Sequence, residues 1–141
     1  MNKKAQQFMN YMQTNFNEGE FALKELQDAR HTTLFYAYIK VGEDLSLKCL
    51  VLMDDTQNIL LRVNLKEWAV CLPLDMDNLL STINQLNCNY PLFKFYYDVT
   101  TRTIALEMIY VAQDDRFEPK ILQNYLAWII RYIPDMLQRL N

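Results

Sequence analysis

Glycine and histidine are scarce in this chain of 141 residues, which has two glycines, four prolines and one histidine. With so few glycines there is no glycine-rich loop to hold a phosphate group. Cys49, Cys71 and Cys88 are 22 and 17 positions apart, whereas a zinc site needs several Cys or His ligands at short spacing. His31 follows Arg30 at an expected strand start and is interpreted as a surface side chain. We therefore expect no metal, no cofactor and no catalytic residue.

Clusters of positive charge are missing as well. The net charge is -3, and no basic run is longer than Lys3-Lys4. Nucleic acid is an unfavourable partner for such a chain, because binding its backbone requires basic patches. No window approaches about 18 uncharged apolar residues, and the N-terminus lacks the apolar core of a signal peptide, so we expect no membrane span. Three cysteines, all expected in the core, favour a reducing cytoplasm.

What the chain does contain is an alternation of polar and apolar residues between 32 and 111. Three runs, at 32–41, 45–53 and 58–65, are separated by short polar connections, which predicts an antiparallel meander. One face of these strands is expected to hold the residues Phe35, Ala37, Ile39, Val41, Leu47, Cys49, Val51, Met53, Ile59, Leu61, Val63 and Leu65. The opposite face receives Leu34, Tyr36, Tyr38, Leu50, Leu52 and Leu60.

Helix-period segments and two further strands complete the chain. A first helix with Ala5, Phe8, Met9, Met12 and Phe16 on its apolar face is expected to stop at Asn17-Glu18-Gly19, and 21–27 reads as a short edge strand. A second helix follows, then a hairpin of 92–99 and 103–111, then a last helix. The sequence thus predicts one α+β domain over 1–141, in the order α-β-β-β-β-α-β-β-α, with an antiparallel sheet and its helices mainly on one face.

Both later helices have apolar stripes and expected caps. The second helix would be capped by Asp75 or Asp77 and end before Pro91. Its stripe consists of Leu79, Leu80, Ile83 and Leu86. In the last helix, Asp115 and Glu118 have capping-box spacing and Pro119 fits the first turn. The apolar positions of that helix, which include Trp128 and Ile130, cover an arc of roughly 200°, wider than one core requires.

This surplus of apolar and tyrosine surface is the strongest functional signal in the sequence. Large aromatic patches on small proteins are typical of interaction surfaces. The candidate partner-binding residues are Tyr36, Tyr38, Trp128 and Tyr132. If these residues bind a partner, Trp128→Glu should weaken association without unfolding the domain. The alternative is a core that extends further round the sheet and buries them.

The hairpin and the helix before it resemble a known family. Ile83-Asn84-Gln85-Leu86-Asn87 at the helix end and Phe93-Lys94-Phe95 in the following strand are similar to the pattern of the YbjN family, within the type III secretion chaperone-like superfamily. The resemblance implies an α+β fold, frequent homodimers, and a role as a peptide-binding chaperone or a regulator of bacterial signalling. It carries no catalytic residue.

Together these features predict a cytoplasmic, non-enzymatic protein-interaction domain that binds a protein partner or itself as a homodimer. A second hypothesis is a small-molecule sensor or enzyme with a tyrosine-lined pocket between sheet and helices. Its support is the nine tyrosines of the chain, which packing explains equally well.

Overall fold

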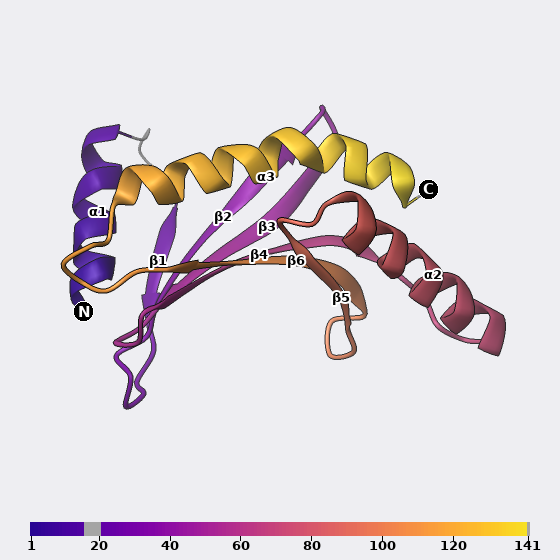
Figure 1. Ribbon diagram of the computed structural model, residues 1–141, viewed down its shortest axis with the longest axis horizontal. Coiled ribbons are helices and arrows are strands. Elements are labelled where there is room, and N and C mark those ends of the chain that lie inside the picture. Colours follow the sequence, from indigo (N-terminus) through magenta and orange to yellow (C-terminus); the bar gives the residue numbers. More distant parts are fainter. Residues whose placement is uncertain (16–20, 141) are drawn as a thin grey trace.

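A computed structural model describes residues 1–15 and 21–140 of the chain (Figure 1). The elements in these residues are α1 (Lys3–Asn15), β1 (Ala22–Glu25), β2 (Thr33–Val41), β3 (Leu45–Met53), β4 (Asn58–Glu67), α2 (Pro73–Asn89), β5 (Lys94–Asp98), β6 (Thr103–Val111) and α3 (Pro119–Arg139). The predicted α+β class and element order are confirmed. The expected end of the first helix, at Asn17-Glu18-Gly19, lies outside the described residues.

The strands form one antiparallel sheet in the order β1-β2-β3-β4-β6-β5. Short connections join β2, β3 and β4 into the predicted meander, and Gly42, with a φ of 68°, supplies a left-handed residue between β2 and β3. After α2 the chain returns so that β6 pairs with β4 and β5 becomes the outer strand. The short edge strand predicted for 21–27 is confirmed at Ala22–Glu25.

The alternation of the strands separates the two faces of the sheet as expected. Phe35, Val51, Leu61 and Met108 lie directly opposite one another across β2, β3, β4 and β6, and all four are buried. Burial of each such side chain is worth about 1.5–3 kcal/mol. This face is therefore the core face.

Helices α1 and α3 cover the core face, as Figure 1 shows. The Phe8 ring of α1 packs edge-on against Phe35, with ring centroids 5.0 Å apart. Helix α3 buries Leu122, Leu126, Ile129, Ile133 and Met136. The predicted apolar arc is wider than this contact, so Trp128 and Ile130 are exposed.

Helix α2 lies beside the β5 edge, and its N-terminal end projects away from the sheet (Figure 1). Leu79 and Leu86 are buried, but Leu80, expected in the same stripe, is 57% exposed, because it lies about 100° round the helix from the buried Leu79. The N-cap prediction is wrong as well. The N-cap is Leu72, and Asp75, the third helical residue, instead accepts hydrogen bonds from the backbone N–H groups of Leu72 and Cys71.

The last turn of α2 protects the outer edge of β5. The side-chain amide of Asn87 donates to the carbonyl of Phe95 at 3.1 Å and accepts from its N–H at 2.9 Å. An edge strand presents unpaired backbone groups that invite aggregation. Asn87 makes both hydrogen bonds with the backbone of Phe95 that a neighbouring strand would otherwise make.

Two further predictions need correction. Glu118 is the N-cap of α3 but makes no side-chain capping bond, so Asp115 and Glu118 form no capping box, whereas Pro119 does open the helix. Of the three cysteines expected in the core, only Cys49 is buried. Cys71 precedes α2 and Cys88 lies on its outward side, where apolar neighbours in sequence do not bring burial.

Candidate functional site

The face of the sheet opposite α1 and α3 has no helix over it among the described residues; we call it the open face. Its centre is a row of four apolar side chains. Leu34, Leu52, Leu60 and Ile109 lie directly opposite one another across β2, β3, β4 and β6. This row mirrors the buried row on the core side. Four neighbouring strands spaced about 4.8 Å apart give it a width of about 14 Å.

Tyr36 and Leu50 extend this row along β2 and β3. They pair with each other, two residues along the strands from Leu34 and Leu52. We call these six side chains the apolar band: Leu34, Tyr36, Leu50, Leu52, Leu60 and Ile109. Ile109 is 56% exposed, the other five side chains of the band are half-buried, and Tyr38, next to the band on β2, is 67% exposed. A contiguous apolar area on one side of a small domain is typical of an interaction site.

The other end of the open face, on β4, β5 and β6, is polar. The Arg62 guanidinium pairs with Asp98, and its Nε donates to Asn64 at 3.3 Å. The hydroxyl of Tyr96 donates to Glu107 at 2.5 Å. Arg62 also lies over the Tyr96 ring, 5.5 Å from its centroid. We call this cluster the polar network.

The ionisation of the polar network is fixed by these contacts. The hydrogen bond from Arg62 is the main cause that lowers the pKa of Asp98. Burial, together with the bond to Glu107, raises the pKa of Tyr96 to about 12. Tyr96 is therefore a neutral donor at physiological pH, and the charges of Arg62 and Asp98 compensate each other. This end of the face is a closed structural network.

Three lysines surround the apolar band on the β1–β3 side. Lys24 is directly opposite Leu34, and Lys48 is opposite Tyr38. Lys40 is two residues beyond Tyr38 on β2. All three are exposed. None of the ion pairs found between described residues includes any of them. The contact recorded for Lys48 is with the Tyr36 ring, 5.8 Å from its centroid.

The four predicted partner-binding residues occupy two surfaces rather than one. Tyr36 and Tyr38 lie on the open face. Trp128 and Tyr132 lie on α3, on the other side of the sheet, where they are 43% and 42% exposed. Tyr132 packs against Tyr90, and Trp128 against Tyr125 of its own helix. The sequence pattern predicted these four residues as one set and did not show that the sheet separates them.

Ile109 and the three lysines are site residues that sequence reasoning missed. The signal was available, because Lys40 shares the parity of Tyr36 and Tyr38 on one strand, and Lys48 shares that of Leu50 and Leu52. The apolar residues alone were taken to define this face, although the lysines occupy the same side of the strands. The polar residues of the same face supply the electrostatics of this surface.

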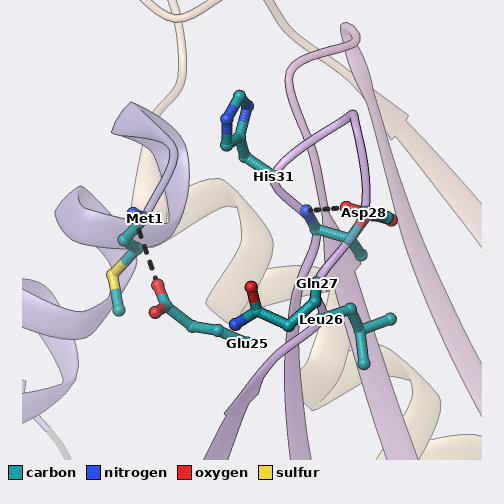
Figure 2. A pocket seen from close by; sticks show the side chains of 7 residues that line it. Met1, Glu25, Leu26, Gln27, Asp28 and His31 are labelled. Atoms are coloured by element: carbon teal, nitrogen blue, oxygen red, sulfur yellow. Dashed lines mark hydrogen bonds and ion pairs between the residues drawn. The ribbon is translucent and has the colours of Figure 1, made fainter.

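A pocket of about 280 Å³ lies at the edge of the sheet, between the N-terminus and the β1–β2 connection (Figure 2). Its residues are Met1, Glu25, Leu26, Gln27, Asp28, His31 and Thr32. The amino group of Met1 pairs with Glu25 at 3.3 Å, and Asp28 accepts two hydrogen bonds from Thr32. This pocket contains no tyrosine and lies outside the space between sheet and helices. It lends no support to the hypothesis of a tyrosine-lined site.

His31 is on the surface, as predicted. Its Nδ1 lies 2.6 Å from a carboxylate oxygen of Asp55, and its φ of 53° places it in the left-handed region at the turn before β2. Within residues 1–15 and 21–140, no group of three His, Cys, Asp or Glu side chains could hold a metal ion. The contact of His31 with Asp55 joins two turns.

Comparisons with family models, curated proteins and solved structures found no match to this chain. No residue's role can therefore be transferred from a relative. Among the described residues, no helix is long and apolar enough to cross a membrane.

Proposed function

We propose that this chain is a non-enzymatic protein-interaction domain whose partner covers the open face of the sheet. The observation that carries the proposal is the apolar band, in which Leu34, Leu52, Leu60 and Ile109 form an apolar row with no element of the described chain packed on it. Covering such a row would remove apolar surface from water, which is the main driving force of protein association.

The proposal includes a relationship to the YbjN family and the type III secretion chaperone-like superfamily. Its supports are the element order, the hairpin β5–β6 placed outside β4, and the helices gathered on one side. The Asn-rich helix end on which the resemblance rests contains Asn87, which contacts the backbone of Phe95 in the aromatic strand. The helix end and the aromatic strand, the two segments of the pattern, are therefore in direct contact.

Self-association is a further part of the proposal, and α2 supplies its surface. Leu72, Met76 and Leu80 continue the apolar stripe of α2 onto the end that projects from the sheet, and all three are exposed. We propose that a second copy covers them in a homodimer. Light scattering at micromolar concentration should give twice the monomer mass, and Leu80→Glu should halve it. A wild-type chain that is strictly monomeric would contradict this part alone.

We also propose a cytoplasmic location, because Cys71 and Cys88 are exposed free thiols, which persist in reducing compartments. A thiol reagent that does not cross membranes should label these cysteines in lysate and not in intact cells. Labelling in intact cells would contradict the location.

Site-specific photo-crosslinking in the native host tests the open face. A photoreactive residue at Tyr38 should capture a discrete protein, because this side chain stands beside the apolar band. The matched control places the same residue at Asn124, an exposed position on α3, and should capture nothing comparable. Capture at Asn124 with none at Tyr38 would overturn the proposal.

A further inference from the structure

The open face is basic although the chain is acidic. The strand residues of this face include five basic and three acidic side chains: Lys24, Lys40, Lys48, Arg62, Lys94, Glu67, Asp98 and Glu107. The face therefore has a net charge of +2, in a chain whose total is -3, so the remainder has -5. The open face thus has a positive net charge, whereas the rest of the chain is acidic.

This positive charge is concentrated next to the apolar band. Arg62 is compensated by Asp98, and Lys94, which lies 3.9 Å from Glu107, balances the remaining acidic charge of the polar network. Lys24, Lys40 and Lys48 have no acidic partner among the described residues. A molecule that covers the band would therefore meet uncompensated cations at the margins of the apolar contact.

The dimensions of the band indicate the shape of that molecule. The apolar row spans four strands, about 14 Å, whereas one extended strand occupies about 5 Å of that width. An α-helix with its side chains is about 10–12 Å across. A helix laid on the band would complete a second helical layer on the sheet, the arrangement that a sheet with two apolar faces favours.

We propose that the open face binds an acidic amphipathic helix of a partner protein. The apolar stripe of this helix packs on the apolar band, and its flanking Asp and Glu residues pair with Lys24, Lys40 and Lys48. This inference rests on the proposed function and specifies the partner's chemistry. A second copy of this face would bring like charges together, which is unfavourable at an interface.

The test uses two synthetic 18-residue peptides with the same leucine stripe at i, i+3, i+4 and i+7. One has glutamate at the flanking positions and the other has lysine. Fluorescence anisotropy with the full chain at low salt should give a dissociation constant at least tenfold smaller for the glutamate peptide. The preference should decline as salt increases, because rim ion pairs are screened.

Charge-reversal variants test whether the preference for the glutamate peptide comes from the open face. K24E/K40E/K48E should abolish or reverse the preference while the thermal unfolding midpoint is unchanged, since all three side chains are exposed. The matched control K3E/K120E/R131E makes the same change of net charge at exposed positions of α1 and α3 and should keep it. If the control loses the preference equally, only the overall charge matters and the inference is overturned.

The remaining outcomes separate this inference from the proposed function. If both peptides bind equally and Leu52→Glu abolishes both, the face binds protein but the acidic preference is wrong. If neither peptide binds and a single-stranded oligothymidylate or a vesicle of one-third phosphatidylserine does, both proposals fail. If no probe binds, the helix inference is overturned, and photo-crosslinking at Tyr38 decides the proposed function on its own.

Discussion

Individual side chains near the N-terminus hold distant parts of the chain together. The Lys4 ammonium is 1% exposed and donates to the carbonyl of Thr56 at 2.7 Å and to Asp114 at 3.1 Å. Asn2 donates to the carbonyls of His31 and Met53. A lysine is rarely buried unless it is paired, and here one ammonium joins α1 to two turns.

Lys4→Ala should lower the free energy of unfolding by about 2 kcal/mol, because it removes a charged hydrogen bond and buried packing. Lys3→Ala is the matched control, since Lys3 is exposed on the same helix, and should change stability by less than about 0.5 kcal/mol. Urea unfolding followed by circular dichroism measures both. Equal effects of the two substitutions would contradict the assigned role of Lys4.

Asp98 should make stability depend on acid pH. Its pKa is lowered in the folded chain, chiefly by Arg62, so the folded state binds protons less readily than the unfolded state. This contribution is complete above the ordinary carboxyl pKa of about 4 and is lost as pH falls through the folded value. Asp98→Asn should therefore destabilise at pH 7 and differ less from wild type at pH 3. Asp44→Asn, in the exposed turn after β2, is the matched control, and an equal pH dependence of the two variants would contradict the role assigned to Asp98.

At the scale of the elements, the contact between α2 and β5 decides how the sheet ends. Asn87 satisfies both backbone groups of Phe95, and the helix beyond this contact projects from the domain. The same helix thus protects an edge with its last turn and exposes apolar residues at its first turns. The position of α2 therefore both protects the edge of β5 and leaves an apolar surface of the helix exposed.

Asn87→Ala should cost about 1–2 kcal/mol of stability, since it leaves a backbone donor and acceptor of β5 without their partner. It should also increase aggregation, because the edge becomes available for pairing. Asn84→Ala, an exposed asparagine on the same helix, is the control. Urea unfolding and light scattering would contradict the account if both variants behaved alike.

The strands were predictable from sequence and the contexts of the helices were not. Alternation at Phe35 and Tyr36 specifies opposite faces wherever the strand lies, because the side-chain period is two. Leu80, by contrast, is expected in the core stripe but is exposed beside the buried Leu79, because the tertiary placement of α2 decides which side of the helix faces the core. Exposure of Cys71 is equally a property of tertiary placement. The candidate site was half predictable: the sequence indicated Tyr36 and Tyr38 but not their separation from Trp128.

At the scale of the whole molecule, the sheet separates two environments. One face is closed by α1 and α3 and provides the stability of the domain. The other combines the apolar band, three lysines and a balanced polar network. If the open face is the binding surface, as we propose, changes on it should affect association without unfolding the chain.

Neighbouring residues of β3 should show this separation. Val51→Glu places a charge on the fully buried core face and should prevent folding, since a buried unpaired charge costs several kcal/mol. Leu52→Glu, one position further on the open face, should lower the free energy of unfolding by about 1 kcal/mol or less. Thermal unfolding followed by circular dichroism measures both, and unfolding of the Leu52 variant would show that this face is part of the core.

The decisive measurement for the open face is the yield of the photo-crosslink from position 38, compared between Leu52→Glu and Trp128→Glu. Leu52 lies in the apolar band, whereas Trp128 lies across the sheet on α3. Folded Leu52→Glu is expected to lose the crosslinked partner. Trp128→Glu is expected to keep it, contrary to the expectation from sequence, because Trp128 lies on the other side of the sheet. Loss in Trp128→Glu with retention in Leu52→Glu would place the partner on α3 and contradict the assignment to the open face.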